Sequence, residues 1–310
     1  MSTPLHAAAG FAAALLVEGI LALVLPAGRT VDAQILGGFV GLASSSHPDQ
    51  AAAWITDRAT PVAYAAIGAV LVAVALARRR PRLAIGVPAA MGAASATTAL
   101  LKAVLAHPRH WHSLWAANLV GPASWPSGHA TAAMMVALGG VLVSPPVLRQ
   151  LVALLGAGLA IAVSFAILIV HWHFPSDVLG GFLVAGVWVS LMLAAISWSE
   201  RVRPTRREIV EAPAGIRTIV APTVLAAAAL CALVVREATT RVHAPFGTAV
   251  VVGASVIATV AVLLTSGLAM ALRASARAAR VPPPSAGIPG EPLVKVDHRA
   301  GAADSRGAGG

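Results

Sequence analysis

The chain alternates between long apolar runs and short polar breaks. Eight runs approach or exceed the ~20 residues that a helix needs to cross a bilayer, and charged residues are rare inside them. The predicted spans are residues 7–26, 61–77, 83–106, 128–148, 150–170, 177–197, 216–235 and 248–272. The pattern therefore predicts an all-α fold, a polytopic integral membrane helical bundle with about eight transmembrane helices.

The segments outside these runs differ in character. Residues 27–60 form a longer, amphipathic connection with a turn-rich break, SSSHPDQ, and we expect short interfacial helices there. The tail after Arg280 is rich in Pro and Gly, which predicts disorder. The N-terminal run lacks the basic region of a signal peptide and is long for one, so we expect an uncleaved first span.

Composition agrees with a membrane protein, since 58% of the 310 residues are hydrophobic and only 11% are charged. A soluble domain could not bury so much apolar surface. Cys231 is the single cysteine, which excludes an intramolecular disulfide and a thiolate metal cluster.

The net charge of +10 has a topological explanation. If the N-terminus is cytoplasmic, 16 of the 22 Lys and Arg residues fall in cytoplasmic segments. Membrane proteins keep their basic residues on that side, so we expect a plasma (inner) membrane protein with both termini in the cytoplasm. The chain also lacks the stacking aromatics and soluble basic face of a nucleic-acid-binding protein, so we expect no nucleic-acid partner.

One layer of the predicted bundle collects polar and aromatic side chains. These residues are His107, His110, His112, His129, His171, His173, Trp111, Trp115, Trp125 and Trp172, at the outer ends of the third to sixth spans. Tryptophan is typical of a membrane interface, which explains part of the set. An interfacial belt does not explain Lys102, Arg109 and Asp177 in the same layer, so we interpret the layer as a candidate site.

The stretch WPSGH begins the fourth span. The first N–H groups of a helix carry partial positive charge, and Gly128 has no side chain to block an anion. The Ser127 hydroxyl can cap the helix or donate to a phosphate oxygen. An ordinary helix cap is the alternative interpretation, although a cap does not need His129.

Two cations precede this stretch. Lys102 lies near the membrane boundary, where an ammonium group is costly unless it is paired, hydrated or functional. Arg109 can bind phosphate through two N–H groups at once. The alternative for Lys102 is a side chain that extends to the outer surface.

The third cluster is HWHFPSDVLGG, in which His173 precedes Asp177 by four residues. A carboxylate that accepts from one imidazole nitrogen leaves the other nitrogen free to attack. Asp177 can also cap the helix that follows, and the two roles are compatible.

Together the three clusters resemble the type 2 phosphatidic acid phosphatase family, whose soluble relatives include vanadium haloperoxidases. The family's first motif is Lys, six residues, then Arg-Pro, and here Lys102 and Arg109 match it with His110 in place of Pro. The second, Pro-Ser-Gly-His, is matched in full by residues 126–129. The third is Ser-Arg, five residues, His, three residues, Asp, and His173 and Asp177 match its second half.

The third motif departs from the family pattern. Counted back from His173, the Ser-Arg positions hold Ala166 and Ile167. An alignment on His171 places Ser164 and Phe165 there and inserts two residues before Asp177. Either way the arginine is missing. We prefer His173, because its spacing to Asp177 is that of the family, and His171 is the rival nucleophile.

The resemblance covers roughly residues 61–198 and implies a six-helix phosphatase-like core. We predict four regions along the chain. They are residues 1–60, the first transmembrane helix and an outer amphipathic connection; residues 61–198, the core with all three motifs; residues 199–272, a cytoplasmic basic loop and two extra transmembrane helices; and residues 273–310, a disordered cytoplasmic basic tail.

The resemblance also implies a chemistry, which is metal-independent hydrolysis of a membrane lipid phosphate or diphosphate at the outer face. His173 would form a phosphohistidine, Asp177 would orient it, and His129 would act as general acid and then as base. The residues implied to hold the phosphate are Lys102, Arg109, Ser127 and Gly128. The expected substrates are polyprenyl or glycerolipid phosphates, with membrane lipids as surroundings and with no cofactor or metal.

Four alternatives stay open. The missing arginine fits a catalytically impaired, phospholipid-binding or scaffold relative. Glu18 and the outer histidines fit a transporter. Ser127 with His129 or His173 would suit a serine hydrolase, although the Gly-x-Ser-x-Gly elbow is absent. The stretches RHWH and HWH would suit a metal site, but no carboxylate cluster accompanies them.

Overall fold

A computed structural model describes residues 2–43, 46–106, 108–109, 120–202 and 244–278 of the chain. In these ranges the regular structure is α-helical, which confirms the predicted all-α polytopic fold. The helices are α1 (Ser2–Leu23), α2 (Pro26–Ala43), α3 (Ser46–Arg58), α4 (Pro61–Ala77), α5 (Pro81–Val104), α6 (Gly128–Val143), α7 (Arg149–Ile169), α8 (Pro175–Val202) and α10 (Ala244–Ala278). The predicted span 216–235 and the tail after Arg280 lie outside the described residues.

Five of the described helices, α1, α5, α7, α8 and α10, are long and apolar enough to cross a membrane. The pair α3 and α4 makes a sixth if it counts as one span, with a bend of 64° between its halves. The helix α6 has 16 residues and is shorter than its predicted span, 128–148. It ends at Val143 because two prolines, Pro145 and Pro146, follow the capping residue Ser144 and cannot continue a helix.

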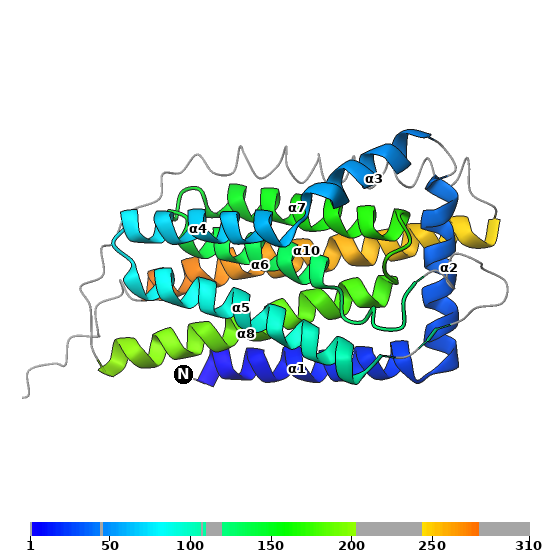
Figure 1. Ribbon diagram of the computed structural model, residues 1–310. Helices are drawn as coiled ribbons and strands as arrows, with labels where there is room; N and C mark the ends of the chain where they lie inside the picture. The colour runs from blue at the N-terminus through cyan, green and yellow to red at the C-terminus, as the bar shows by residue number, and fades with distance from the viewer. Residues whose placement is uncertain (1, 44–45, 107, 110–119, 203–243, 279–310) are drawn as a thin grey trace, which may run out of the picture.

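The long helices lie lengthwise beside one another, and α2 lies across one end of the bundle (Figure 1). Most of the connection 27–60, where short helices were expected, forms α2 with 18 residues and α3 with 13 residues. The chain turns sharply between the end of α1 at Leu23 and the start of α2 at Pro26. Gly28, in the first turn of α2, lies so close to α1 that a Cβ there would meet the Leu21 carbonyl oxygen at 2.0 Å. Arg29 then donates from Nε to the Leu23 carbonyl at 3.1 Å and satisfies an open acceptor at the end of α1. This turn fixes α2 over the bundle end.

The helix α6 forms the centre of the bundle. It packs against α7, α8 and α5, and most of its side chains are buried, including Met134, Met135 and Leu138. The contact with α7 is close because Gly156 faces Ala137, and a Cβ on Gly156 would come within 2.7 Å of the Ala137 Cβ. Small residues at such contacts let membrane helices approach closely.

Chain direction brings the candidate residues together. The helices α5 and α7 end, and α6 and α8 begin, at the end of the bundle that α2 covers (Figure 1). Lys102 near the end of α5, Gly128 at the start of α6 and Pro175 at the start of α8 therefore share one layer. The candidate site lies in this layer.

The α6–α7 contact can be tested with two substitutions on one helix. We expect Gly156→Ala to lower the midpoint of thermal unfolding in detergent, because the crowding costs about 1–3 kcal/mol. Gly158→Ala is the matched control, since it is exposed and its new Cβ would meet nothing within 4 Å. The control should unfold at the wild-type temperature or slightly above it. Equal midpoints for the two variants would contradict the close contact.

Candidate active site

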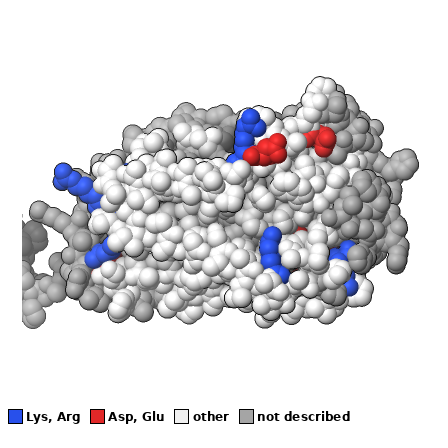
Figure 2. Space-filling view, viewed as in Figure 1, with Lys and Arg blue, Asp and Glu red and all other residues white. Residues whose placement is uncertain are grey.

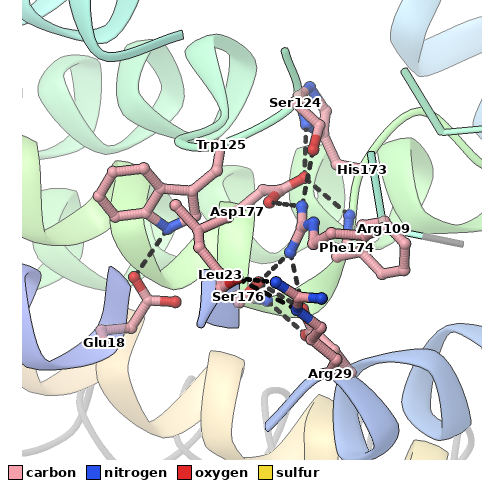
Figure 3. Close-up of polar contacts among 11 residues, drawn as sticks. Glu18, Leu23, Arg29, Arg109, Ser124, Trp125, His173, Phe174, Ser176 and Asp177 are labelled. Atoms are coloured by element: carbon pink, nitrogen blue, oxygen red, sulfur yellow. Dashed lines mark hydrogen bonds and ion pairs between the residues drawn. The ribbon is translucent and has the colours of Figure 1, made fainter. Parts of the chain in front are cut away.

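Asp177 is the centre of the site and is fully buried in the first turn of α8. Its Oδ1 accepts from Arg109 Nη2, and its Oδ2 lies 3.2 Å from His173 Nδ1 (Figure 3). Oδ2 also accepts from the Phe174 N–H at 2.9 Å, in the manner of a helix-capping residue. The carbonyl of Asp177 accepts from the Ser127 N–H at 2.7 Å. Capping α8 and orienting His173 therefore coexist in one side chain.

His173 is the histidine that the structure brings to Asp177, and it is buried. An ionised carboxylate only accepts hydrogen bonds, so Nδ1 of a neutral His173 carries the proton and Nε2 keeps its lone pair. His171 lies in the turn after α7 with a left-handed φ of 58°. Burial lowers the pKa of His171, and the charge of Asp49 opposes that shift.

His129 faces His173 across the site. Their ring centroids are 6.2 Å apart at an interplanar angle of 65°. The ring of His129 also lies 5.5 Å from that of Trp172. His129 is the second residue of α6, so the start of α6 places one imidazole opposite the other.

The first turn of α6 has a side-chain cap, and the space beside Gly128 is open. Ser127 is the N-cap, and its Oγ accepts from the Ala130 N–H at 3.3 Å. Ser127 is therefore a helix cap, as the alternative interpretation held. Its hydroxyl proton is still available to donate to a ligand. A side chain on Gly128 would meet nothing within 4 Å. An anion can thus approach the first turn of α6 closely.

Two consecutive glycines in α8 let this segment pack against the start of α6. A Cβ on Gly181 would lie 2.7 Å from the Ser127 carbonyl oxygen, and one on Gly180 would lie 2.8 Å from Trp125 Nε1. These glycines follow Asp177 by three and four residues and so share its helix face. The GG in VLGGFLV is therefore part of the site's construction.

Arg109 has contacts different from the predicted grip on phosphate. Its Nη1 donates to Asp32 at 3.0 Å and to Ser176 at 2.9 Å, and its Nη2 donates to Ser124 at 2.6 Å and to Asp177. The guanidinium carbon also lies 4.0 Å from the Phe174 ring centroid. Protein acceptors thus take all four terminal N–H groups, which makes Arg109 an organiser of the site.

Asp32 on α2 is a member of the site that the sequence did not reveal. Its Oδ1 accepts from the Ser176 N–H at 2.9 Å, and its Oδ2 accepts from Arg109. The negative charge of the Asp32 carboxylate is favourable here, because the N-terminus of α8 is the positive end of the helix. Burial raises the pKa of Asp32 to about 6, while Arg109 and the Ser176 hydrogen bonds oppose the rise.

Glu18 on α1, which the sequence suggested as part of a transporter, pairs with Trp125 in the structure. Its Oε2 accepts from Trp125 Nε1 at 2.8 Å (Figure 3). A Cβ on Gly19 would lie 3.0 Å from the indole ring, so Trp125 lies against α1 on one side and Gly180 of α8 on another. Glu18 therefore holds the residue two positions before Ser127.

Lys102 is half-buried in the last turn of α5, within electrostatic range of Asp177 and His129. It is thus a cation at the site whose charge can act on an anion held there.

The positions of the missing third-motif arginine carry apolar side chains of α7. Ile167 is fully buried in the hydrophobic core, and Phe165 packs 5.2 Å from Phe39. The Ser164 hydroxyl donates within its own helix, to the Ala160 carbonyl. Neither alignment therefore gives α7 a polar group that replaces the arginine.

Several predicted residues lie outside the described part of the chain, namely His107, His110, Trp111, His112 and Trp115, and with them the stretch RHWH. Among the residues that the structure does describe, no group of three or more His, Cys, Asp or Glu side chains could hold a metal ion.

The buried ion pairs of Arg109 give a stability test. Arg109→Lys keeps the charge but cannot bridge two carboxylates and two hydroxyls, so we expect a loss of about 3–5 kcal/mol. Thermal unfolding in detergent measures it. Arg58→Lys is the control, because Arg58 is exposed on α3 above the Trp54 ring and its loss should be about 0.5 kcal/mol or less. Similar midpoints for Arg109→Lys and the wild type would contradict the network.

Comparison with known proteins gives one match. Residues 60–201 match the family model described as the PAP2 superfamily, which confirms the resemblance inferred from the three motifs. No curated protein and no solved structure matches the chain. The matched region contains Lys102, Arg109, the PSGH stretch, His173 and Asp177, whereas Asp32 and Glu18 lie before it.

Proposed function

Because residues 60–201 belong to the PAP2 superfamily, whose members are generally phosphatases, we propose that this chain hydrolyses lipid phosphates or diphosphates through a phosphohistidine. The observation that carries the proposal is the pair His173–Asp177 facing His129 beside the open first turn of α6. A nucleophile, its orienting carboxylate, a second proton carrier and an anion-binding helix end meet in one layer.

In the first step, Nε2 of His173 attacks phosphorus. The P–N bond forms as the bond from phosphorus to the leaving oxygen breaks. Asp177 holds the Nδ1 proton of His173 and stabilises the positive charge that develops on the ring. Protonated His129 gives its proton to the leaving oxygen, which departs as an alcohol or as a lipid monophosphate.

In the second step, His129 is neutral and accepts a proton from water. The water oxygen attacks phosphorus, the P–N bond breaks, and inorganic phosphate leaves with His173 restored. His129 ends the cycle protonated, so protons and charge balance over the two steps.

The phosphate oxygens need positive charge while the bonds exchange. The first turn of α6 at Gly128, the Ser127 hydroxyl and the Lys102 ammonium supply it in this proposal. Arg109 contributes only its charge and no hydrogen bond to the phosphate in this proposal. Its terminal N–H groups already donate to Asp177, Asp32 and two serines. Its main task is to keep Asp177 ionised and aimed at His173.

The position of the site supports a lipid substrate. The site occupies the end of a bundle of membrane-type helices, the depth at which lipid headgroups lie. A polyprenyl or glycerolipid phosphate can place its phosphorus there and leave its chains in the bilayer. The distribution of Lys and Arg along the sequence favours the outer face of the plasma membrane, with both termini in the cytoplasm.

The buried, apolar Ile167 at the position of the missing arginine favours a second candidate, a phospholipid-binding relative without turnover. Loss of one charged donor to a developing oxyanion can cost on the order of 10²–10³ in rate. The two candidates share the phosphate site and differ only in whether phosphate is released.

A phosphate-release assay on purified full-length protein separates them. The panel contains a polyprenyl diphosphate, phosphatidylglycerol phosphate and phosphatidic acid, with and without vanadate. We expect release from at least one lipid, inhibition by vanadate, and a loss of at least about 10³-fold in His173→Ala and His129→Ala. His171→Ala is the matched control and should stay within about tenfold of the wild type.

Two outcomes oppose the proposed chemistry. Full activity in His173→Ala would exclude His173 as the nucleophile, and activity abolished by a chelator would exclude the metal-independent scheme. Saturable binding of these lipids with no release from any of them would favour the phospholipid-binding relative.

A further inference from the structure

Four arginines gather at the end of the bundle opposite His173. Arg78 follows α4, Arg80 precedes α5, Arg149 begins α7, and Arg273 lies in the last turns of α10. The charge of Arg149 interacts with those of the other three. Figure 2 shows Lys and Arg side chains at this end, where Figure 1 places the end of α4 and the start of α5. We call this set the arginine cluster.

Arg149 is the unusual member, because it is only 6% exposed and its Nε has no hydrogen-bond partner. Nη2 of Arg273 is also buried without a partner. Buried charged donors are costly unless something accepts from them. Within the described ranges, no carboxylate forms an ion pair with any member of the arginine cluster.

The first N–H groups of α7 also lack a side-chain acceptor. Its N-cap is Leu148, whose side chain cannot accept a hydrogen bond, so no side chain caps the first N–H groups. The N-terminus of a helix is its positive end, where an arginine is unfavourable and an anion is favourable. An anion at this place would satisfy Arg149 and the helix end together.

Arg78 is held in place for such a ligand. Its Nη1 donates to the carbonyl of Val143, the last residue of α6. Burial and the neighbouring Arg80 lower the pKa of Arg78. Like charges held together in this way repel one another until an anion lies between them.

We propose that the arginine cluster binds the phosphate group of an anionic phospholipid from the membrane leaflet at this end of the bundle. Guanidinium groups match phosphate oxygens through paired N–H donors. The cluster lies at the ends of four helices, the depth of the headgroups. It is separate from the His173 site, because the 21 residues of α7 put about 30 Å between their two ends. The proposal does not depend on catalysis.

The test uses full-length protein in a neutral detergent, with phosphatidylglycerol as the probe. This lipid is a phosphodiester, so a phosphomonoesterase does not consume it. We expect it to raise the midpoint of thermal unfolding by several degrees, and phosphatidylcholine to have little effect. Arg149→Met and Arg78→Met should each lose at least half of the shift.

Two variants control the site of action. Arg58→Met removes an exposed arginine from α3 and should keep the whole shift. His173→Ala should keep it as well, which separates this site from the proposed phosphatase site. If Arg149→Met does not fold, Arg273→Met replaces it and should lose at least half of the shift.

Inorganic phosphate at millimolar concentration distinguishes the source of the phosphate group. A shift with phosphate alone that Arg149→Met removes would support the same chemistry with a soluble ligand. An equal shift with phosphatidylcholine, a full shift in Arg149→Met or Arg273→Met, or no shift with either phosphate-bearing probe would overturn the proposal.

Discussion

The buried charge of Asp177 is the constraint on which the site depends. A carboxylate without access to water must be paired, and Arg109 pairs it while also holding Asp32. The second oxygen of Asp177 is then free to fix the tautomer of His173, and its backbone carbonyl holds Ser127. One ion pair thus determines how His173 is oriented and where the first turn of α6 lies. The transverse position of α2 is part of the same constraint, because α2 carries Asp32.

The two ends of the bundle balance their cations differently. At the His173 end, Arg109 has two carboxylates and two hydroxyls as partners within the protein. At the opposite end, Arg149 is as deeply buried, yet no carboxylate in the described part of the chain pairs with it. Burial without a partner points to a ligand from outside the protein. The same physical rule therefore explains a completed network at one end and a proposed lipid site at the other.

Sequence could predict the features that depend on neighbours along the chain. Apolar run lengths predicted the described helices other than α2 and α3, and the spacing of four between His173 and Asp177 predicted a local contact that the structure contains. The contacts of Asp32 and Glu18 could not be predicted, since their partners lie 77 and 107 residues away and neither residue belongs to a motif. Their positions depend on α1 and α2 packing against the core, which no local pattern encodes. Arg109 was found by its motif, but its contacts with carboxylates depend on the same packing.

The central claim is that His173 carries the phosphoryl group. The His129→Ala protein can be mixed with an aryl phosphate that is labelled on phosphorus and whose leaving group needs no proton. The reaction is then stopped in alkali, in which phosphohistidine is stable. Because the variant lacks the proposed base for the second step, we expect label to accumulate on the peptide that contains His173. The double variant His129→Ala/His173→Ala should carry no label there. Label on Ser127, or release of the aryl group with no covalent label on the protein, would contradict it.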